Sequence, residues 1–255
     1  MTVATAPEKT APEKTTHVIA FDRLGRYGAD WLDSRFHFNF SGVAAPMGFG
    51  FGPLRVWNDD TIKPHSGFPM HGHRDMEIIT YVRRGAITHE DNLGNRGRTP
   101  AGDVQVMSAG TGIMHAEWNE ENEPTHLFQI WVEPREANLK PRWAQAQFPR
   151  DDRAGKLVPL ASGEASIREA NPEALLIHQD ATLFGAMLKA GNSLRHDLPE
   201  GRIAYLVLAD GDATVNGEAL KTRDGAAVFH TDALDIVTKN GAEILLFDLP
   251  HPQGR

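Results

Sequence analysis

The sequence contains no cysteine, no surplus of basic residues and no long apolar segment. The missing cysteine excludes disulfide bonds, thiolate metal ligands and a cysteine nucleophile, but it does not identify the cell compartment. The longest apolar run that we find, residues 203–209 (IAYLVLA), is far too short to cross a bilayer. The first ten residues, MTVATAPEKT, lack the apolar core of a signal peptide. We therefore predict a cytoplasmic protein with no membrane partner.

Acidic residues outnumber basic residues, 34 to 26, and the formal net charge is -8. A surface of this charge disfavours direct contact with nucleic acid. The 255 residues include 40% hydrophobic and 24% charged side chains, an ordinary composition for a globular protein with a buried core. The length suits one large domain or two domains of about 100–150 residues each.

The chain begins with a polar segment, and short segments with the composition of β-strands follow it. The motif APEKT occurs twice in residues 6–15, and we predict a disordered tail over residues 1–16 because this composition cannot bury apolar surface. Beyond it, short apolar segments alternate with turns of glycine, asparagine and aspartate, which predicts antiparallel β-sandwiches or barrels. A weaker helical pattern covers residues 170–176. The charged segment 148–156, FPRDDRAGK, is the predicted boundary between two similar β domains.

Histidine and tryptophan are concentrated in the first half. All five tryptophans lie before residue 144, and six of the twelve histidines lie between residues 65 and 126. If the segment HGHRDME is one extended strand, it puts two histidines and two carboxylates on one side: His71, His73, Asp75 and Glu77. Facing inward, such groups need hydrogen bonds or a cation, whereas facing solvent they carry no functional meaning.

A second polar cluster favours the first interpretation. His115 and Glu117 lie two residues apart, directly after a glycine-rich turn. Two neighbouring strands of one barrel can bring four side chains to one point, namely His71, His73, His115 and Glu117. Three imidazoles and one carboxylate suit Fe(II), Cu(II), Ni(II), Mn(II) or Zn(II). Four protein ligands leave one or two coordination positions open, as in catalytic sites.

These segments resemble the two motifs of the cupin superfamily. The first motif, G-x(5)-H-x-H-x(3,4)-E-x(6)-G, is similar to a set that has altered spacing at both glycines: Gly67, His71, His73, Glu77 and Gly85. The second motif, G-x(5)-P-x-G-x(2)-H-x(3)-N, is similar to a set with serine in place of proline and a longer gap before the histidine: Gly102, Ser108, Gly110, His115 and Asn119. Together with HEDNLGN, QIWVEP and LLFDLP, these departures resemble bacterial members of the pirin family over roughly residues 20–250.

The resemblance implies an all-β bicupin, with two antiparallel jelly-roll β-barrels. Residues 17–147 would form the metal-binding N-terminal cupin, and residues 148–255 a C-terminal cupin that lacks the ligand pattern. In that second half, His196 and His230 have no companion ligands. The ligands carried over from the family are His71, His73, His115 and Glu117. Glu77 would orient the site without binding the metal.

The family also implies an activity. Members with these motifs are described as quercetin 2,3-dioxygenases, which cleave flavonols with O2 and release carbon monoxide. Glu117 would be the catalytic base, the substrate a small planar aromatic molecule, and the cofactor one divalent transition metal, with Fe(II) favoured and Cu, Ni, Mn, Co or Zn as alternatives. The alternative is a non-catalytic metal-binding regulator that acts through protein partners. We expect a monomer.

The remaining candidates have more ordinary interpretations. His65 is expected to be a solvated loop residue and His126 an edge-strand residue. His89, Glu90 and Asp91 belong to HEDNLGN, where turn formation is the better interpretation than substrate contact. Four residues are candidates for an apolar pocket wall, although core packing is the simpler role for each: Phe51, Phe68, Met70 and Met107. Trp131 is expected to pack in the core.

Overall fold

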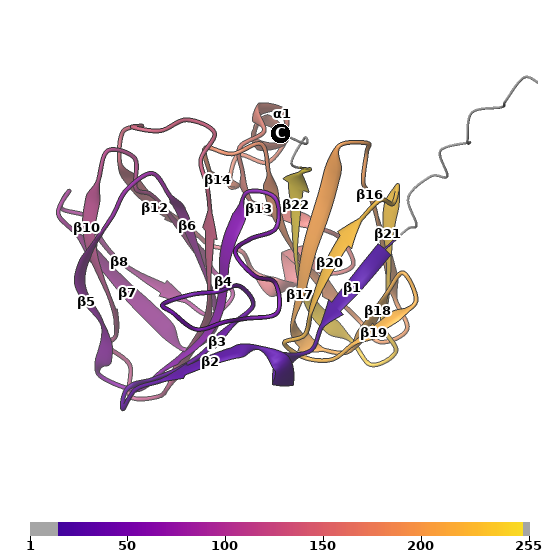
Figure 1. Cartoon of the computed structure of the whole chain (residues 1–255), viewed down its shortest axis with the longest axis horizontal. Helices are drawn as coiled ribbons and strands as arrows, with labels where there is room; N and C mark the ends of the chain where they lie inside the picture. The colour runs from indigo at the N-terminus through magenta and orange to yellow at the C-terminus, as the bar shows by residue number, and fades with distance from the viewer. Residues whose placement is uncertain (1–14, 252–255) are drawn as a thin grey trace, which may run out of the picture.

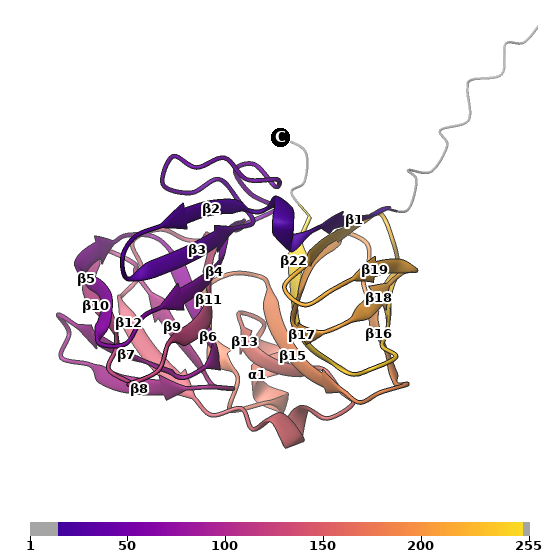
Figure 2. The same ribbon diagram turned by 90° about the horizontal axis from the view of Figure 1, so that it is seen from below.

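The computed structural model describes residues 15–251 as two β-sandwiches that lie side by side (Figures 1 and 2). The predicted disordered tail, residues 1–16, lies outside the described residues except for Thr15 and Thr16. These two residues begin strand β1 (Thr15–Ile19) and are therefore ordered β-structure. No helix within residues 15–251 has the length and apolar character needed to cross a membrane.

The N-terminal sandwich pairs a seven-stranded sheet, ordered β12-β9-β6-β11-β4-β3-β2, with a four-stranded sheet, ordered β5-β10-β7-β8. All pairings in both sheets are antiparallel. A 3-10 turn, η1 (Phe21–Arg23), precedes the strands. Their bounds are β2 (Gly25–Gly28), β3 (Leu32–Phe36), β4 (Leu54–Ile62), β5 (Ser66–His73), β6 (Glu77–Arg84), β7 (Ala86–Asp91), β8 (Arg96–Pro100), β9 (Val104–Ser108), β10 (Ile113–Asn119), β11 (Thr125–Val132) and β12 (Arg142–Ala146).

The C-terminal sandwich has the same arrangement. A seven-stranded sheet, ordered β1-β20-β17-β22-β15-β13-β14, pairs with a four-stranded sheet, ordered β16-β21-β18-β19. It follows the 3-10 turn η2 (Arg150–Arg153). Its strands are β13 (Val158–Ser162), β14 (Leu175–Leu176), β15 (Thr182–Leu188), β16 (Ser193–Asp197), β17 (Arg202–Gly211), β18 (Ala213–Val215), β19 (Glu218–Leu220), β20 (Gly225–Phe229), β21 (Ala233–Val237) and β22 (Ala242–Pro250). The predicted all-β bicupin fold is confirmed.

The helix prediction over residues 170–176 is wrong in position. The helix α1 covers Ala165–Ala170. It ends where Pro172 follows Asn171, because a residue before proline is disfavoured in the α conformation. Leu175 and Leu176 form the short strand β14, which pairs in parallel with β13.

Strand β1 precedes the N-terminal sandwich in the sequence but belongs to the C-terminal sandwich in the structure. It pairs with β20 of the C-terminal sheet, although the chain then continues into the N-terminal sandwich (Figure 1). The sequence division that places residues 17–147 in the N-terminal cupin does not anticipate this pairing. The boundary at 147/148 itself stays a prediction.

Apolar packing differs between the two sandwich interiors. The largest core cluster joins the two halves, since it contains Trp57 and Phe128 together with Tyr205 and Phe247. The interior of the C-terminal sandwich is a separate, continuous apolar cluster that includes Leu206, Val215 and Ile244. In the N-terminal sandwich two small clusters leave polar residues between them. The polar cavity described below lies in that N-terminal interior.

Candidate metal centre

The two histidines of the first motif lie at the end of an edge strand. The segment that we treated as one extended strand is divided, because β5 ends at His73 and β6 begins at Glu77 in the opposite sheet. Asp75, between them, has a positive φ of 47°. The prediction that Glu77 shares the face of the histidines is therefore wrong.

A bulge in β5 places His71 opposite His115. The register pairs His115 with His71 but Glu117 with Phe68, so β5 contains one extra residue at this point. Pro69 lies in the bulge of this edge strand, a position where proline is tolerated. The carbonyl of Pro69 accepts a hydrogen bond from Nδ1 of His71 at 2.8 Å. This bond fixes the tautomer and leaves Nε2 of His71 available as a ligand.

Three imidazoles converge between β5 and β10. The ring centroids of His71 and His115 are 4.5 Å apart, those of His71 and His73 are 4.8 Å apart, and those of His73 and His115 are 5.1 Å apart. One nitrogen from each ring lies within 4.8 Å of the other two. The predicted juxtaposition of these histidines is present in the structure.

Glu117 lies in the same cavity, against a row of polar side chains that crosses the seven-stranded sheet. Gln105 donates to Oε1 of Glu117 at 2.7 Å, and Gln129 donates to Oε2 at 2.8 Å. Thr80, the cross-strand neighbour of both glutamines, donates to Oε1 at 3.3 Å. A carboxylate has about four lone-pair sites, so these three bonds leave Oε2 with one site for a cation or a proton.

Hydrogen bonds between Asp91 and His89 and between His89 and His115 orient the His115 ring. Nε2 of His89 is 3.1 Å from Oδ2 of Asp91, and Nδ1 of His89 is 3.4 Å from Nδ1 of His115. A carboxylate only accepts, so Nε2 of His89 carries a hydrogen, and in a singly protonated ring Nδ1 is then an acceptor. Nδ1 of His115 must donate to it, which leaves the lone pair of His115 on Nε2. The indole of Trp143 stacks on His89, with centroids 4.8 Å apart and planes 7° apart.

The donor set fits a divalent cation. Nε2 of His115 is buried and has no hydrogen-bond partner among the described residues. Burial, together with neighbouring imidazoles, lowers the pKa of His115 to about 3 and the pKa of His73 to about 4. Both rings are therefore neutral at pH 7, the form that binds metal. This orphaned buried nitrogen, beside two further imidazoles and a carboxylate, suits a nitrogen- and oxygen-binding transition metal.

Aromatic and aliphatic side chains form the walls of this cavity, whose volume is ≈ 250 Å³. Phe68, for which core packing is the simpler interpretation of the sequence, lines the cavity together with Phe40 and Ile78. Trp131 is not a simple core residue, because its indole packs edge-on against His73 with centroids 4.8 Å apart. Asp60 also lines the cavity, and burial raises the pKa of this carboxyl to about 7.

The other three candidates for the pocket wall lie elsewhere. Phe51 packs against Tyr205 at the junction of the two halves. Met107 is buried in a core cluster of the N-terminal sandwich. Met70 is 48% exposed, on the side of β5 away from the histidines.

Glu77 contacts a different part of the molecule. Ser108, which stands where the cupin motif has proline, donates to Glu77 at 2.8 Å, and the backbone of His178 also bonds this carboxylate. Burial raises the pKa of Glu77. These contacts of Glu77 do not involve the three clustered histidines, so its orienting role stays a prediction.

The remaining histidines are mostly structural. His65 is in an exposed contact with Asn122, as expected for a loop residue. His126 bonds Thr61, but β11 lies between β4 and β6 and is not an edge strand. Asp91 accepts bonds from the backbone of Leu93 and Asn95, which confirms turn formation in HEDNLGN.

Sequence reasoning missed the residues that support Glu117 and His115. The signal for the first group is an isolated polar residue in each of three apolar strands: Thr80, Gln105 and Gln129. In the second group, Asp91 caps the turn and also bonds His89, and His89 in turn bonds His115. In the C-terminal sandwich, His196 bonds Asp248 at 2.8 Å, and no metal-ligand cluster occurs in the described part of that half.

Comparison with known proteins gives a consistent result. A family model described as Pirin matches residues 18–132, and one described as Quercetinase C-terminal cupin domain matches residues 165–249. A pirin-like protein of Caulobacter vibrioides is 51% identical over 89% of this chain and 97% of its own length. A quercetin 2,3-dioxygenase of Escherichia coli is 40% identical over 89% of this chain and 95% of its own length. The crystal structure of YhhW from Escherichia coli matches with a TM-score of 0.87 and 36% identity, covering 94% of this chain and all of the other. A nickel(II) complex of YhhW matches with a TM-score of 0.86 and 36% identity, covering 93% of this chain and 100% of that one.

Proposed function

The chain belongs to the pirin family, and from this premise we propose that it is a metal-dependent quercetin 2,3-dioxygenase that cleaves flavonols with O2 and releases carbon monoxide. The observation that carries the proposal is that three clustered imidazoles and one carboxylate line a single apolar-walled cavity in the N-terminal sandwich. The names of the relatives support the same activity. Fe(II) stays our first choice of metal, and the nickel complex of a relative supports a divalent ion.

In this proposal His71, His73, His115 and Glu117 hold the cation. When bound, the cation supplies Lewis acidity, which lowers the pKa of a hydroxyl that it coordinates. Glu117 would accept the proton of the flavonol 3-hydroxyl through the one free site on Oε2, so its two roles are alternatives: ligand before the substrate binds, and base once the hydroxyl is in place. Gln105 and Gln129 hold the carboxylate in place while the proton moves.

The cavity walls select a flat, apolar substrate. Phe68 and Trp131 flank the histidines from opposite sheets of the sandwich and exclude water from the reacting ring. The cavity volume of ≈ 250 Å³ is below the usual range for ligand sites, about 300–1,000 Å³. We therefore expect part of a three-ring flavonol to extend out of the cavity.

The test is turnover of quercetin in air by protein loaded separately with iron, copper, nickel, manganese or cobalt. Loss of the long-wavelength absorbance with release of carbon monoxide is the expected result. Failure of every metal form to turn over quercetin removes the proposal. Metal analysis of wild type and His73→Ala, which should lose the ion, tests the ligand set independently of substrate.

Glu117→Gln tests the base, with Glu169→Gln on the exposed side of α1 as the control. The amide must face one of the glutamine donors, so we expect a stability loss of about 1–3 kcal/mol in addition to lost turnover. Turnover equal to wild type in folded Glu117→Gln protein contradicts the proposed role.

The regulatory alternative rests on an exposed apolar surface. Met70, Met114 and Trp118, on the two strands that carry the histidines, are 48%, 41% and 41% exposed. Such residues suit a protein contact that senses the metal state. Recovery of a specific partner by metal-loaded protein but not by metal-free protein would favour this function.

A further inference from the structure

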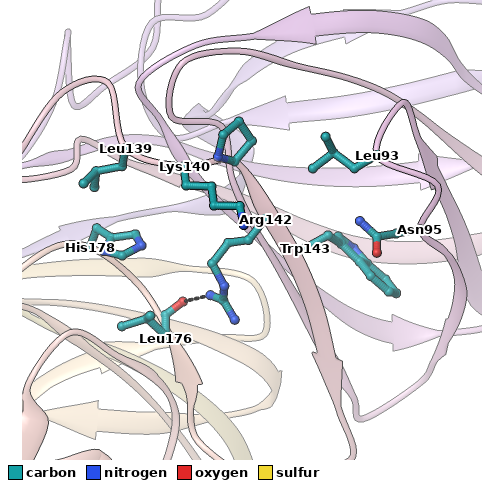
Figure 3. A pocket seen from close by; sticks show the side chains of 9 residues that line it. Leu93, Asn95, Leu139, Lys140, Arg142, Trp143, Leu176 and His178 are labelled. Carbon is teal, nitrogen blue, oxygen red and sulfur yellow. Dashed lines mark hydrogen bonds between the residues drawn. The ribbon is translucent and has the colours of Figure 1, made fainter.

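A second cavity lies where the two halves meet. Its volume is ≈ 560 Å³, within the range of small-molecule sites. Its walls come from the β7–β8 turn, the segment that leads into β12 with the first residues of that strand, and β14 with the residues after it. Figure 3 shows the lining side chains: Leu93, Asn95, Leu139, Lys140, Pro141, Arg142, Trp143, Leu176 and His178. We call this cavity the junction pocket. It is lined by none of the residues that line the candidate metal centre.

The charge on the pocket wall has one sign. Lys140 and Arg142 line the pocket, and none of its nine lining residues is acidic. Arg142 stands between His178 and Trp143 in Figure 3, held by a bond from Nη1 to the carbonyl of Leu176 at 2.8 Å. Burial lowers the pKa of Arg142, Glu77 opposes this shift, and Arg168 adds to it. Ser108 and the backbone of His178 also hydrogen-bond Glu77, so Arg142 is not the only group that compensates the charge of this carboxylate.

The uncharged part of the wall is suited to a flat ring. Three leucines and the indole of Trp143 supply apolar surface. The indole nitrogen of Trp143 is buried without a hydrogen-bond partner among residues 15–251. Burial lowers the pKa of His178, so at pH 7 this imidazole is a neutral hydrogen-bonding group and not a third cation.

From this arrangement we propose that the junction pocket binds a small aromatic carboxylate. The carboxylate pairs with the guanidinium of Arg142, the geometry that favours planar anions, and Lys140 adds long-range attraction. The ring lies against Trp143 and the leucines. Because the site shares no residue with the candidate metal centre, its existence does not depend on the proposed dioxygenase activity.

The test compares 2-naphthoate with its neutral analogue 2-naphthol on full-length, metal-free protein by calorimetry. We expect one naphthoate per chain, bound at least tenfold more tightly than naphthol. Arg142→Met should weaken naphthoate binding about tenfold or more, the effect of one charge-assisted hydrogen bond. Lys140→Met should weaken it about twofold to threefold, and Lys189→Met, an exposed lysine of the other sandwich, should not change it.

Each contrary result overturns the proposal. Equal affinity for the two probes, or no binding, means that the pocket does not recognise an anion. Loss of binding in His73→Ala places the probe at the metal centre instead. Lys140 is exposed, so Lys140→Met will fold even if Arg142→Met does not, and unchanged binding in that variant alone contradicts the assignment.

Discussion

Replacement of His89 by alanine should weaken metal binding, although His89 is not itself one of the proposed ligands. His89 is fully buried, and its Nδ1 accepts from Nδ1 of His115. Without that acceptor, His115 loses the bond that keeps its lone pair on Nε2. Groups that orient metal ligands in this way typically change affinity by 10- to 100-fold.

The distance sets the expected size of the effect. At 3.4 Å the contact between His89 and His115 is at the long end for a hydrogen bond. We therefore expect the lower limit, about tenfold, which corresponds to about 1.4 kcal/mol of binding free energy. The alanine also leaves a cavity beside Trp143, so the free energy of unfolding of the metal-free protein should fall by about 2–4 kcal/mol.

Chelator competition with Ni(II) measures the affinity, and circular dichroism checks the fold. His89→Asn keeps an acceptor close to the position of Nδ1 and should recover most of the affinity. His126→Ala removes a half-buried histidine that bonds Thr61 and should leave metal binding unchanged. If folded His89→Ala protein binds Ni(II) within twofold of wild type, the hydrogen-bonded chain does not support the site.

Three further outcomes follow from the same cavity. The folded pKa of Asp60, about 7, lies above the ordinary value of 3.8, so the native protein retains a proton that the unfolded chain releases. Wild type should therefore lose up to about 3 kcal/mol of stability relative to Asp60→Asn as pH rises from 4 to 7, and parallel pH profiles from denaturant titrations would refute this. Gln129→Leu leaves Oε2 of Glu117 without its donor and should cost about 1–3 kcal/mol in urea unfolding, whereas Gln147→Leu, at an exposed position, should cost almost nothing. Addition of Ni(II) at 100 times its dissociation constant should stabilise the protein by about 2.7 kcal/mol, and a melting temperature that does not respond to chelator contradicts a site formed only in the native state.

The sequence was sufficient to predict the fold class and to select the histidines that cluster. His71, His73 and His115 lie on short motifs with regular alternation, so local spacing contains the necessary information. The residues that support the site come from strands that are distant along the chain. Gln105 and Gln129 meet Glu117 only because β9, β6 and β11 pair in one register. That register depends on nonlocal packing, which a single sequence does not display.

The division of HGHRDME between two sheets was missed for a related reason. Alternation alone cannot distinguish a continuous strand from two strands joined by a tight turn at Asp75. The misassigned Trp131 shows a similar limit, because an apolar residue in a central strand can face either the core or a ligand cavity. In both cases the partner sheet decides the outcome.

The exchange of β1 has a consequence for anyone who wishes to work with the halves separately. A gene cut near residue 147 would express the first fragment with a detached strand, and the second with β20 paired to β17 alone. Each fragment would expose backbone hydrogen-bonding groups that invite aggregation. Co-expressed fragments, in contrast, should reassociate, because Thr15–Ile19 of the first fragment can pair with β20 of the second.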